Sequence, residues 1–178
     1  AVETLQGPYL QVPLPRMIRK RAGWLAALFL GEMLTATAMG QFEAEIAHAV
    51  VLALFVPLII SSGGNSGAQA NTLVIRAMAL GEVRLREWWR VIRREVITGF
   101  GLGAILASIG MARILLWQFL FNAYGDHYFL IALTVAFSLV GVVLWGAVAG
   151  SILPFILRRL GFDPASASAP FVATLVDV

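Results

Sequence analysis

Long apolar stretches alternate with short polar connections along this chain, and their lengths fit helices that cross a lipid bilayer. A helix needs about 20 consecutive apolar residues to span the hydrocarbon core. The pattern predicts five membrane-spanning helices, at residues 22–41, 46–79, 96–121, 128–157 and 166–178. The last stretch is too short for a complete span, so we expect the fifth helix to be truncated at Val178.

The second stretch is longer than one span requires. We therefore expect it to be tilted, broken or extended beyond the bilayer. A break is easiest at Pro57 or at the pair Gly63-Gly64, since proline and glycine residues are common causes of kinks in long helices.

Residues 84–94 have a different pattern, with apolar and basic side chains on opposite sides of a helix. Leu85, Trp88, Trp89 and Ile92 recur at helical spacing, and arginines cover the other side. This pattern predicts a separate amphipathic helix at the membrane surface, where its tryptophans would anchor it in the headgroup layer.

The composition favours an all-α integral membrane protein. Hydrophobic residues make up 60% of the chain and charged residues 13%, whereas soluble domains have roughly 45–50% and about 25%. A soluble core of this size could not bury so much apolar surface. The chain has no cysteine, which excludes disulfides, thiolate metal sites and a cysteine nucleophile.

The basic residues support the count of five spans. All but one of the 13 lysines and arginines fall on one side of the membrane in this arrangement, and Arg113 is the exception. Positive charge marks the cytoplasmic side, so the net charge of +3 reports topology and not nucleic-acid binding. We expect a multi-pass plasma-membrane protein with a cytoplasmic N-terminus. Residues 1–21 would form a juxtamembrane linker or connecting helix, and residues 22–178 the transmembrane pore domain.

Small and polar residues are concentrated in the second stretch. On a helix, Asn65, Gln69, Thr72 and Arg76 share one face. A polar group left unsatisfied in lipid costs roughly 2–7 kcal/mol, so this face must meet other helices or water. Two interpretations remain, which are helix packing through small residues and the wall of an ion path. The residues concerned are Ser61, Gly63, Gly64, Asn65, Gly67, Ala68, Gln69, Asn71 and Thr72.

Asp177 is a carboxylate inside the fifth apolar stretch. By helical spacing it shares a face with Pro170, Ala173 and Thr174. A carboxylate within a span by default indicates an ion or proton path. Mg²⁺ retains most of its waters and is held by one or two carboxylates, so a single aspartate suits a hydrated magnesium ion. The alternative is an aspartate neutralised by a neighbouring arginine or by protonation.

Glu32, Glu43 and Glu45 are further acidic candidates. Glu32 lies near the middle of the first stretch, where it would be a second cation site or proton acceptor, or else a protonated acid bonded to a neighbouring helix. Glu43 and Glu45 would raise the local cation concentration at the outer mouth. His48 follows Glu45 by three residues, but these two side chains are too few to hold a metal, and a solvated surface is favoured.

Several of these residues together resemble the MgtE family of magnesium channels. The segment 63–69, the preceding Pro57 and the later Arg76 look like the second-helix signature of that family. The segment 173–177 completes the match. The resemblance extends over roughly residues 16–178.

The resemblance implies a homodimer of five-helix subunits, with a pore on the two-fold axis between the second and fifth helices. It implies that Asp177 binds hydrated magnesium, helped by backbone groups near Ser61 and Gly64. Cytoplasmic sensor domains, expected outside this chain, would close the pore when magnesium is high. The expected metal-site residues are Asp177, Thr174, Ala173, Gly64, Ser61, Asn65, Thr72 and Glu32, with Pro170 and Ala169 beside the pore.

Three positions depart from the family pattern. The family often has asparagine where this chain has Ala68 and Ala169, which leaves selectivity for magnesium over cobalt, manganese or zinc open. Glu32 stands where family members have a small residue, which suggests an added site or a proton role.

Other classes of protein compete with a magnesium channel. Gly64–Gly67 matches the GxSG pattern of intramembrane serine proteases, but His48 would lie about 27 Å from Ser66 along the same helix. We therefore expect no enzyme. A membrane anchor without transport activity, a broader divalent transporter and a proton-coupled carrier remain as alternatives.

Overall fold

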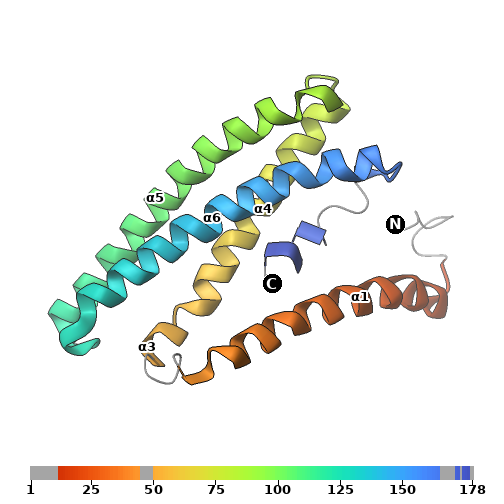
Figure 1. Ribbon diagram of the computed structural model, residues 1–178. Coiled ribbons are helices and arrows are strands. Elements are labelled where there is room, and N and C mark those ends of the chain that lie inside the picture. The colour runs from red at the N-terminus through yellow and green to blue at the C-terminus, as the bar shows by residue number, and fades with distance from the viewer. Residues whose placement is uncertain (1–11, 45–49, 165–170, 173, 177–178) are drawn as a thin grey trace.

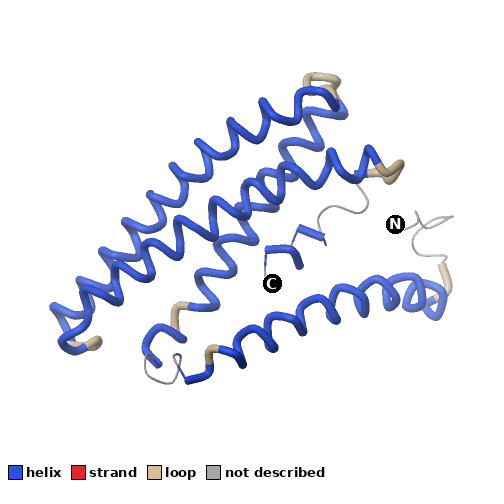
Figure 2. Tube along the Cα trace, viewed as in Figure 1, coloured by secondary structure: helices blue, strands red, loops and turns tan. Residues whose placement is uncertain are grey.

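The chain folds into long helices. The computed structural model describes residues 12–44, 50–164, 171–172 and 174–176, and these residues contain no β-strand. Figures 1 and 2 show the arrangement. The elements are α1 (Leu14–Gln41), α3 (Val50–Ala53), α4 (Val56–Ala79), η2 (Leu85–Glu87), α5 (Trp88–Phe121), η3 (Gly125–His127) and α6 (Tyr128–Arg159).

Helix α6 is the centre of the described bundle, since it packs along both α4 and α5. A helix that is covered on two sides is expected to be apolar nearly all round. The stretch Gly125–Arg159 has the highest mean hydropathy of the candidate spans, 2.4. Its side chains Val135, Leu139 and Val143 are almost fully buried, and Ile114 of α5 completes this core.

Glycines bring the helix backbones unusually close together. A Cβ atom added to Gly103 of α5 would lie 2.9 Å from Cα of Val140 in α6, and one added to Gly99 would lie 3.0 Å from Cβ of Ala147. Small residues at such crossings are the usual means of helix association in lipid, where apolar burial gives little driving force.

The predicted break in the second stretch occurs at Pro57 and not at the glycine pair. The helical turn α3 ends at Ala53, and Pro57 lies in the first turn of α4, where a proline removes no helical hydrogen bond. Helix α4 then continues through Gly63 and Gly64 without interruption. Helical glycine is unfavourable by about 1 kcal/mol relative to alanine, and close packing against α6 offsets that cost here.

The prediction of a separate amphipathic helix at residues 84–94 was wrong. Helix α5 runs for 34 residues from Trp88 to Phe121 and includes most of that segment. No glycine or proline interrupts the sequence between Trp88 and Gly99, so nothing ends the helix before the third apolar stretch.

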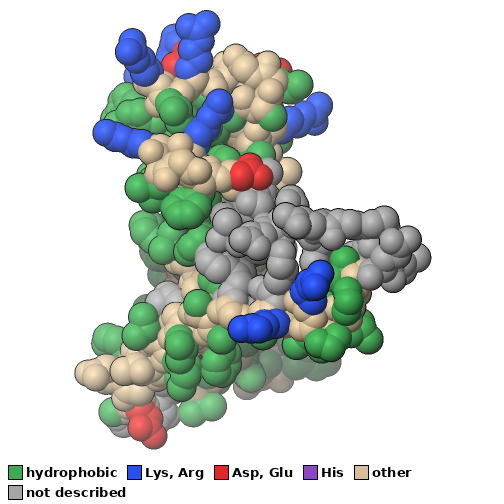
Figure 3. Space-filling model, turned by 90° about the vertical axis from the view of Figure 1, so that its right-hand side faces the viewer, with side chains coloured by type: hydrophobic (Ala, Val, Ile, Leu, Met, Phe, Trp, Pro, Cys, Tyr) green, Lys and Arg blue, Asp and Glu red, His purple; other side chains and the backbone are tan. Residues whose placement is uncertain are grey.

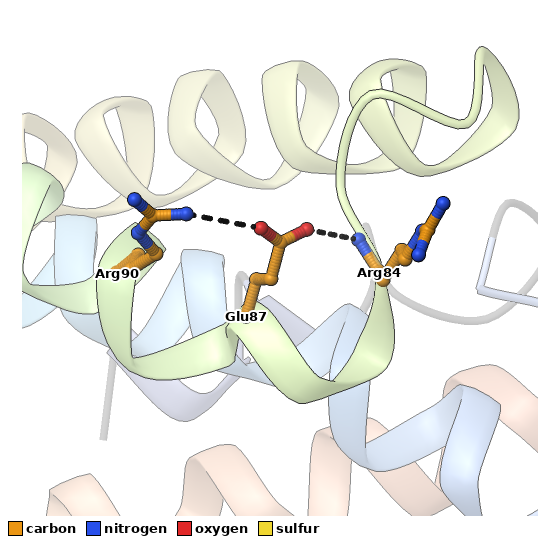
Figure 4. A network of polar contacts seen from close by, with 3 residues as sticks. All are labelled: Arg84, Glu87 and Arg90. Atoms are coloured by element: carbon orange, nitrogen blue, oxygen red, sulfur yellow. Dashed lines mark hydrogen bonds and ion pairs between the residues drawn. The ribbon is translucent and has the colours of Figure 1, made fainter.

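The start of α5 is stabilised by Glu87 in η2 (Figure 4). The Glu87 carboxylate accepts a hydrogen bond from the backbone N–H of Arg84 at 3.0 Å and pairs with the Arg90 guanidinium at 3.2 Å. The first of these contacts satisfies a backbone donor that would otherwise be left free at a helix start.

Helix α1 begins earlier than the predicted first span. It contains 28 residues and starts at Leu14, so it includes the basic positions Arg16 and Arg19 of the predicted linker or connecting helix. Within the described residues it packs extensively against no other helix. Its apolar side chains, such as Phe29 and Leu34, are about 60% exposed in the single chain.

Three helical stretches in the described part of the chain are long and apolar enough to cross a membrane. They are Val50–Ala79, Leu85–Phe121 and Gly125–Arg159. The total of five spans, which adds α1 and the fifth stretch, stays a prediction.

The helices alternate in direction, as the charge pattern requires. In Figure 1 the end of α4, the start of α5 and the end of α6 lie toward the upper right, whereas the turn between α5 and α6 lies at the lower left. Most of the arginine side chains visible in Figure 3 gather at the upper end of the view, above a largely apolar surface, and others lie lower on the same face. One end of the molecule is therefore strongly basic.

Candidate functional site

Helix α4 has two faces of different character, and the candidate site is built on both. The first face is buried against the rest of the chain. It consists of Gly63, Ser66, Gly67, Ala70, Asn71, Val74 and Met78. Most of these side chains are small, so α6 approaches the α4 backbone directly at Gly63 and Gly67, which face Gly146 and Gly150.

The second face of α4 is polar and uncovered in the single chain. Its members recur every three or four residues, as one face of a helix requires. They are Ser61, Asn65, Ala68, Gln69, Thr72 and Arg76, all exposed, with Gly64 half-buried at the edge. The Thr72 hydroxyl donates to the carbonyl of Ala68 at 2.8 Å, so its oxygen still accepts hydrogen bonds from outside the helix.

The segment 171–176 lies against the buried face of α4. A Cβ atom added to Gly67 would lie 2.7 Å from Cγ1 of Val172, and one added to Gly63 would lie 2.9 Å from Cγ1 of Val176. Both valines are buried, and with Ala149 of α6 they form a small apolar cluster. The blue C-terminal segment beside α4 and α6 in Figure 1 shows this position.

A hydrogen bond links the same segment to α6. The indole N–H of Trp145 donates to the backbone carbonyl of Leu175 at 3.4 Å. Leu175 itself is exposed, whereas its neighbour Val176 is buried. The short segment is therefore fixed by apolar contacts to α4 and by a polar contact to α6.

Thr174 points toward α1. A Cβ atom added to Gly31 would lie 3.0 Å from Cγ2 of Thr174, and the Thr174 side chain is half-buried. The segment 171–176 therefore connects α1 with the α4–α6 pair. Gly31 is a position where only a small residue fits.

The remaining acidic candidates are not gathered into one site by the described residues. Glu32 and Glu43 are both exposed, Glu32 on α1 and Glu43 shortly after its end. Within the described residues no three histidine, cysteine, aspartate or glutamate side chains lie together as a metal site. The candidates Asp177, Ala173, Ala169, Pro170 and Glu45, and also His48, lie outside the described residues.

Comparison with known families identifies the chain. Residues 56–178, from the start of α4 onward, match the family model of MgtE, described as a divalent cation transporter. The chain belongs to the MgtE family. The resemblance predicted from the glycine-asparagine segment and the fifth apolar stretch is therefore confirmed.

Three curated MgtE relatives are similar to this chain, and each is named a magnesium transporter. The one from Thermus thermophilus is 39% identical over 158 residues, that from Enterococcus faecalis 31% over 159, and that from Bacillus subtilis 32% over 159. Each match covers 89% of this chain. The chain spans about a third of the length of these relatives.

Ser66 has a packing role in this MgtE fold. Its side chain is 8% exposed, and its hydroxyl donates to the carbonyl of Val143 in α6 at 3.0 Å. His127 lies in η3, 16 positions before Val143, which corresponds to about 24 Å along a helix at roughly 1.5 Å per residue. Family and relatives are named as transporters and not as enzymes, which agrees with the expectation of no enzyme.

Sequence reasoning missed the partners of the α4 glycines. Gly146 and Gly150 of α6 have the same spacing of four as Gly63 and Gly67, and each lies against one of them. The signal that could have predicted this contact is the equal spacing of two glycine pairs on different helices, which is typical of close helix packing in membranes. Of the two interpretations left open for Asn71, its burial favours helix packing, since its side chain is 2% exposed and belongs to the buried face of α4.

Proposed function

We propose that this chain forms the transmembrane pore domain of a magnesium transporter, in which the polar face of α4 and the fifth helix line the ion path. Membership of the MgtE family and the presence of three membrane-length apolar helices support this proposal. The names of the relatives support magnesium as the transported ion.

The observation that carries the proposal is the exposed polar face of α4. Asn65 and Thr72 lie along a helical stretch that is long and apolar enough to cross a membrane, and both are exposed in the part of the chain that the structure describes. A polar group facing lipid costs several kcal/mol (roughly 2–7). The face is therefore expected to meet water, a hydrated ion or a second subunit. An ion path on the two-fold axis of a homodimer would bring this face into contact with water, a hydrated ion and a second subunit.

Asp177 is the proposed ligand of the hydrated cation. It follows the described turn Thr174–Val176, which is attached to α4 through Val176. By sequence spacing Asp177 shares a face with Thr174, on the side away from Val172 and Val176. Mg²⁺ exchanges its waters reluctantly, so a carboxylate that binds the hydrated ion fits a path lined by amides, hydroxyls and backbone carbonyls.

The assembly and its location are part of the same proposal. A homodimer would place two copies of the α4 polar face opposite each other. About two thirds of each relative lies outside the matched segment, which leaves room for a cytoplasmic regulatory domain. The basic end of the molecule supports a plasma-membrane orientation with that end in the cytoplasm.

Magnesium flux into liposomes tests the proposal, using the protein in its natural full-length form. The variant Asp177→Ala should reduce flux at least tenfold while the protein stays folded and dimeric. A matched control is Asp126→Ala, since Asp126 lies in the polar turn η3, away from α4. Equal flux for Asp177→Ala and wild type would overturn the proposed role of Asp177. Undetectable flux in the wild type would favour a membrane anchor.

A further inference from the structure

A pocket opens at the basic end of the molecule, where η2 and the start of α5 approach the last turns of α6. Its volume is about 510 Å³. It lies away from the polar face of α4 that the proposed ion path uses, because residues of α5, η2 and α6 form its walls. The residues that matter here are Arg86, Trp88, Ile152, Phe155, Ile156 and Arg159.

The lining combines positive charge with an apolar wall. Arg86 belongs to η2 and Arg159 to the last turn of α6, so two separate elements each contribute an arginine to the lining of one cavity. Among the residues that the structure describes, no acidic side chain lines the pocket. The carboxylate of Glu87, which follows Arg86 in the sequence, pairs with Arg90. Guanidinium groups attract phosphate and can bind it in a bidentate manner.

The apolar part of the pocket argues for a lipid and not for a free phosphate. Phe155 is 7% exposed and forms a closed wall, whereas Ile156 is 47% exposed and offers apolar surface to an occupant. A free phosphate ion would gain nothing from these side chains. Trp88 is held edge-on against Trp89, with ring centroids 5.6 Å apart, and tryptophan at this depth is typical of the headgroup layer.

The depth of the pocket along α6 also fits a lipid. Helix α6 is apolar until its last turn and ends with Arg158 and Arg159. The pocket therefore includes the transition from hydrocarbon to headgroup, with Ile152 on the apolar side and Arg159 on the polar side. A phospholipid would place its phosphate between the arginines and an acyl chain along Ile152 and Ile156.

We propose that this cavity, the Arg86–Arg159 pocket, binds an anionic phospholipid from the membrane leaflet at the basic end. The two arginines bind the headgroup phosphate, and the apolar wall holds one acyl chain. Anionic lipid would then tie the start of α5 to the end of α6. This site is independent of the ion path and does not rest on the proposed function.

Native mass spectrometry and thermal unfolding in nanodiscs test this site. We compare wild type in phosphatidylglycerol with wild type in phosphatidylcholine, and add soluble glycerol phosphate in a third arm. We expect phosphatidylglycerol to stay bound and raise Tm, and glycerol phosphate to have no effect. Equal Tm in both lipids overturns the proposal. So does an effect of glycerol phosphate equal to that of phosphatidylglycerol. All three comparisons use the wild type alone.

Charge-removing variants locate the site. Each of Arg86→Gln and Arg159→Gln should weaken phosphatidylglycerol retention about fivefold, and the double variant more than tenfold. Arg93→Gln is the matched control, because Arg93 is an exposed arginine of α5 outside the pocket. Equal loss in Arg93→Gln, or unchanged retention in the folded double variant, means that phosphatidylglycerol binds only the general surface charge and the pocket is not the site.

Discussion

Gly67 of α4 and Val172 of the fifth apolar stretch are in direct contact, with no room for a further carbon atom between them. A Cβ added to Gly67 would lie 2.7 Å from Cγ1 of Val172 and 3.1 Å from the carbonyl oxygen of Gly146. One glycine thus sets the distance from α4 to two other parts of the chain. The polar face on the opposite side of α4 depends on this packing for its position.

The first prediction is that Gly67→Ala destabilises the protein and reduces magnesium flux. The added methyl group would push the segment 171–176 away from α4, and overpacking of this kind costs typically about 1–3 kcal/mol. Asp177 follows that segment, so the proposed cation ligand would move with it. Tm in detergent and flux in liposomes measure the two effects.

A matched control comes from Gly141, which lies within α6. A Cβ atom added there would have no neighbour within 4 Å. Gly141→Ala should keep or slightly raise Tm, because alanine is favoured over helical glycine by about 1 kcal/mol. If both variants behave alike, close packing at Gly67 is not the cause of the effect.

The second prediction concerns the polar face of α4. Thr72→Val keeps the shape of the side chain and removes its hydroxyl, which would lower magnesium flux about tenfold if that oxygen contacts the hydrated ion, the equivalent of about 1.4 kcal/mol. Thr134→Val in α6 is a close control, since both threonines are exposed and donate to the carbonyl four residues earlier at 2.8 Å. A similar flux for the two variants would place Thr72 outside the ion path.

The third prediction separates Ser66 from its neighbours in the motif. Ser66→Ala removes the hydrogen bond to Val143, and interhelical hydrogen bonds in membranes are worth about 0.6 kcal/mol on average. We expect a small decrease in Tm with nearly unchanged flux. Labelling of Ser66 by a serine-reactive probe would contradict this packing role and revive the protease alternative.

The sequence was sufficient for the features that depend on local pattern. The helix break at Pro57 follows from the geometry of proline alone. The alternating direction of the helices follows from the distribution of arginines. The shared helical face of Asn65 and Thr72 follows from their spacing along α4. Each of these depends on residues close together in the sequence.

The features that the sequence did not reveal depend on contacts between distant residues. The segment from Ser61 to Thr72 contains two faces, and only the position of α6 shows that Gly63 and Gly67 pack while Asn65 does not. The continuity of α5 was missed for another reason. Charge and tryptophan content suggested an interfacial helix, but the absence of a helix breaker before Gly99 allows one helix to pass through both environments.

The last prediction tests whether Glu32 couples transport to protons. Glu32 is exposed on α1, next to Gly31, which contacts Thr174. The backbone at Glu32 therefore lies near the fifth segment, and the predicted proton role of Glu32 can be tested there. If transport is coupled, a pH gradient drives magnesium uptake in the wild type, and Glu32→Gln abolishes that dependence while voltage-driven flux persists. Glu43→Gln, beyond the end of α1, should keep the wild-type response. Flux in the wild type that responds to voltage and not to pH would assign Glu32 a structural role and favour a channel.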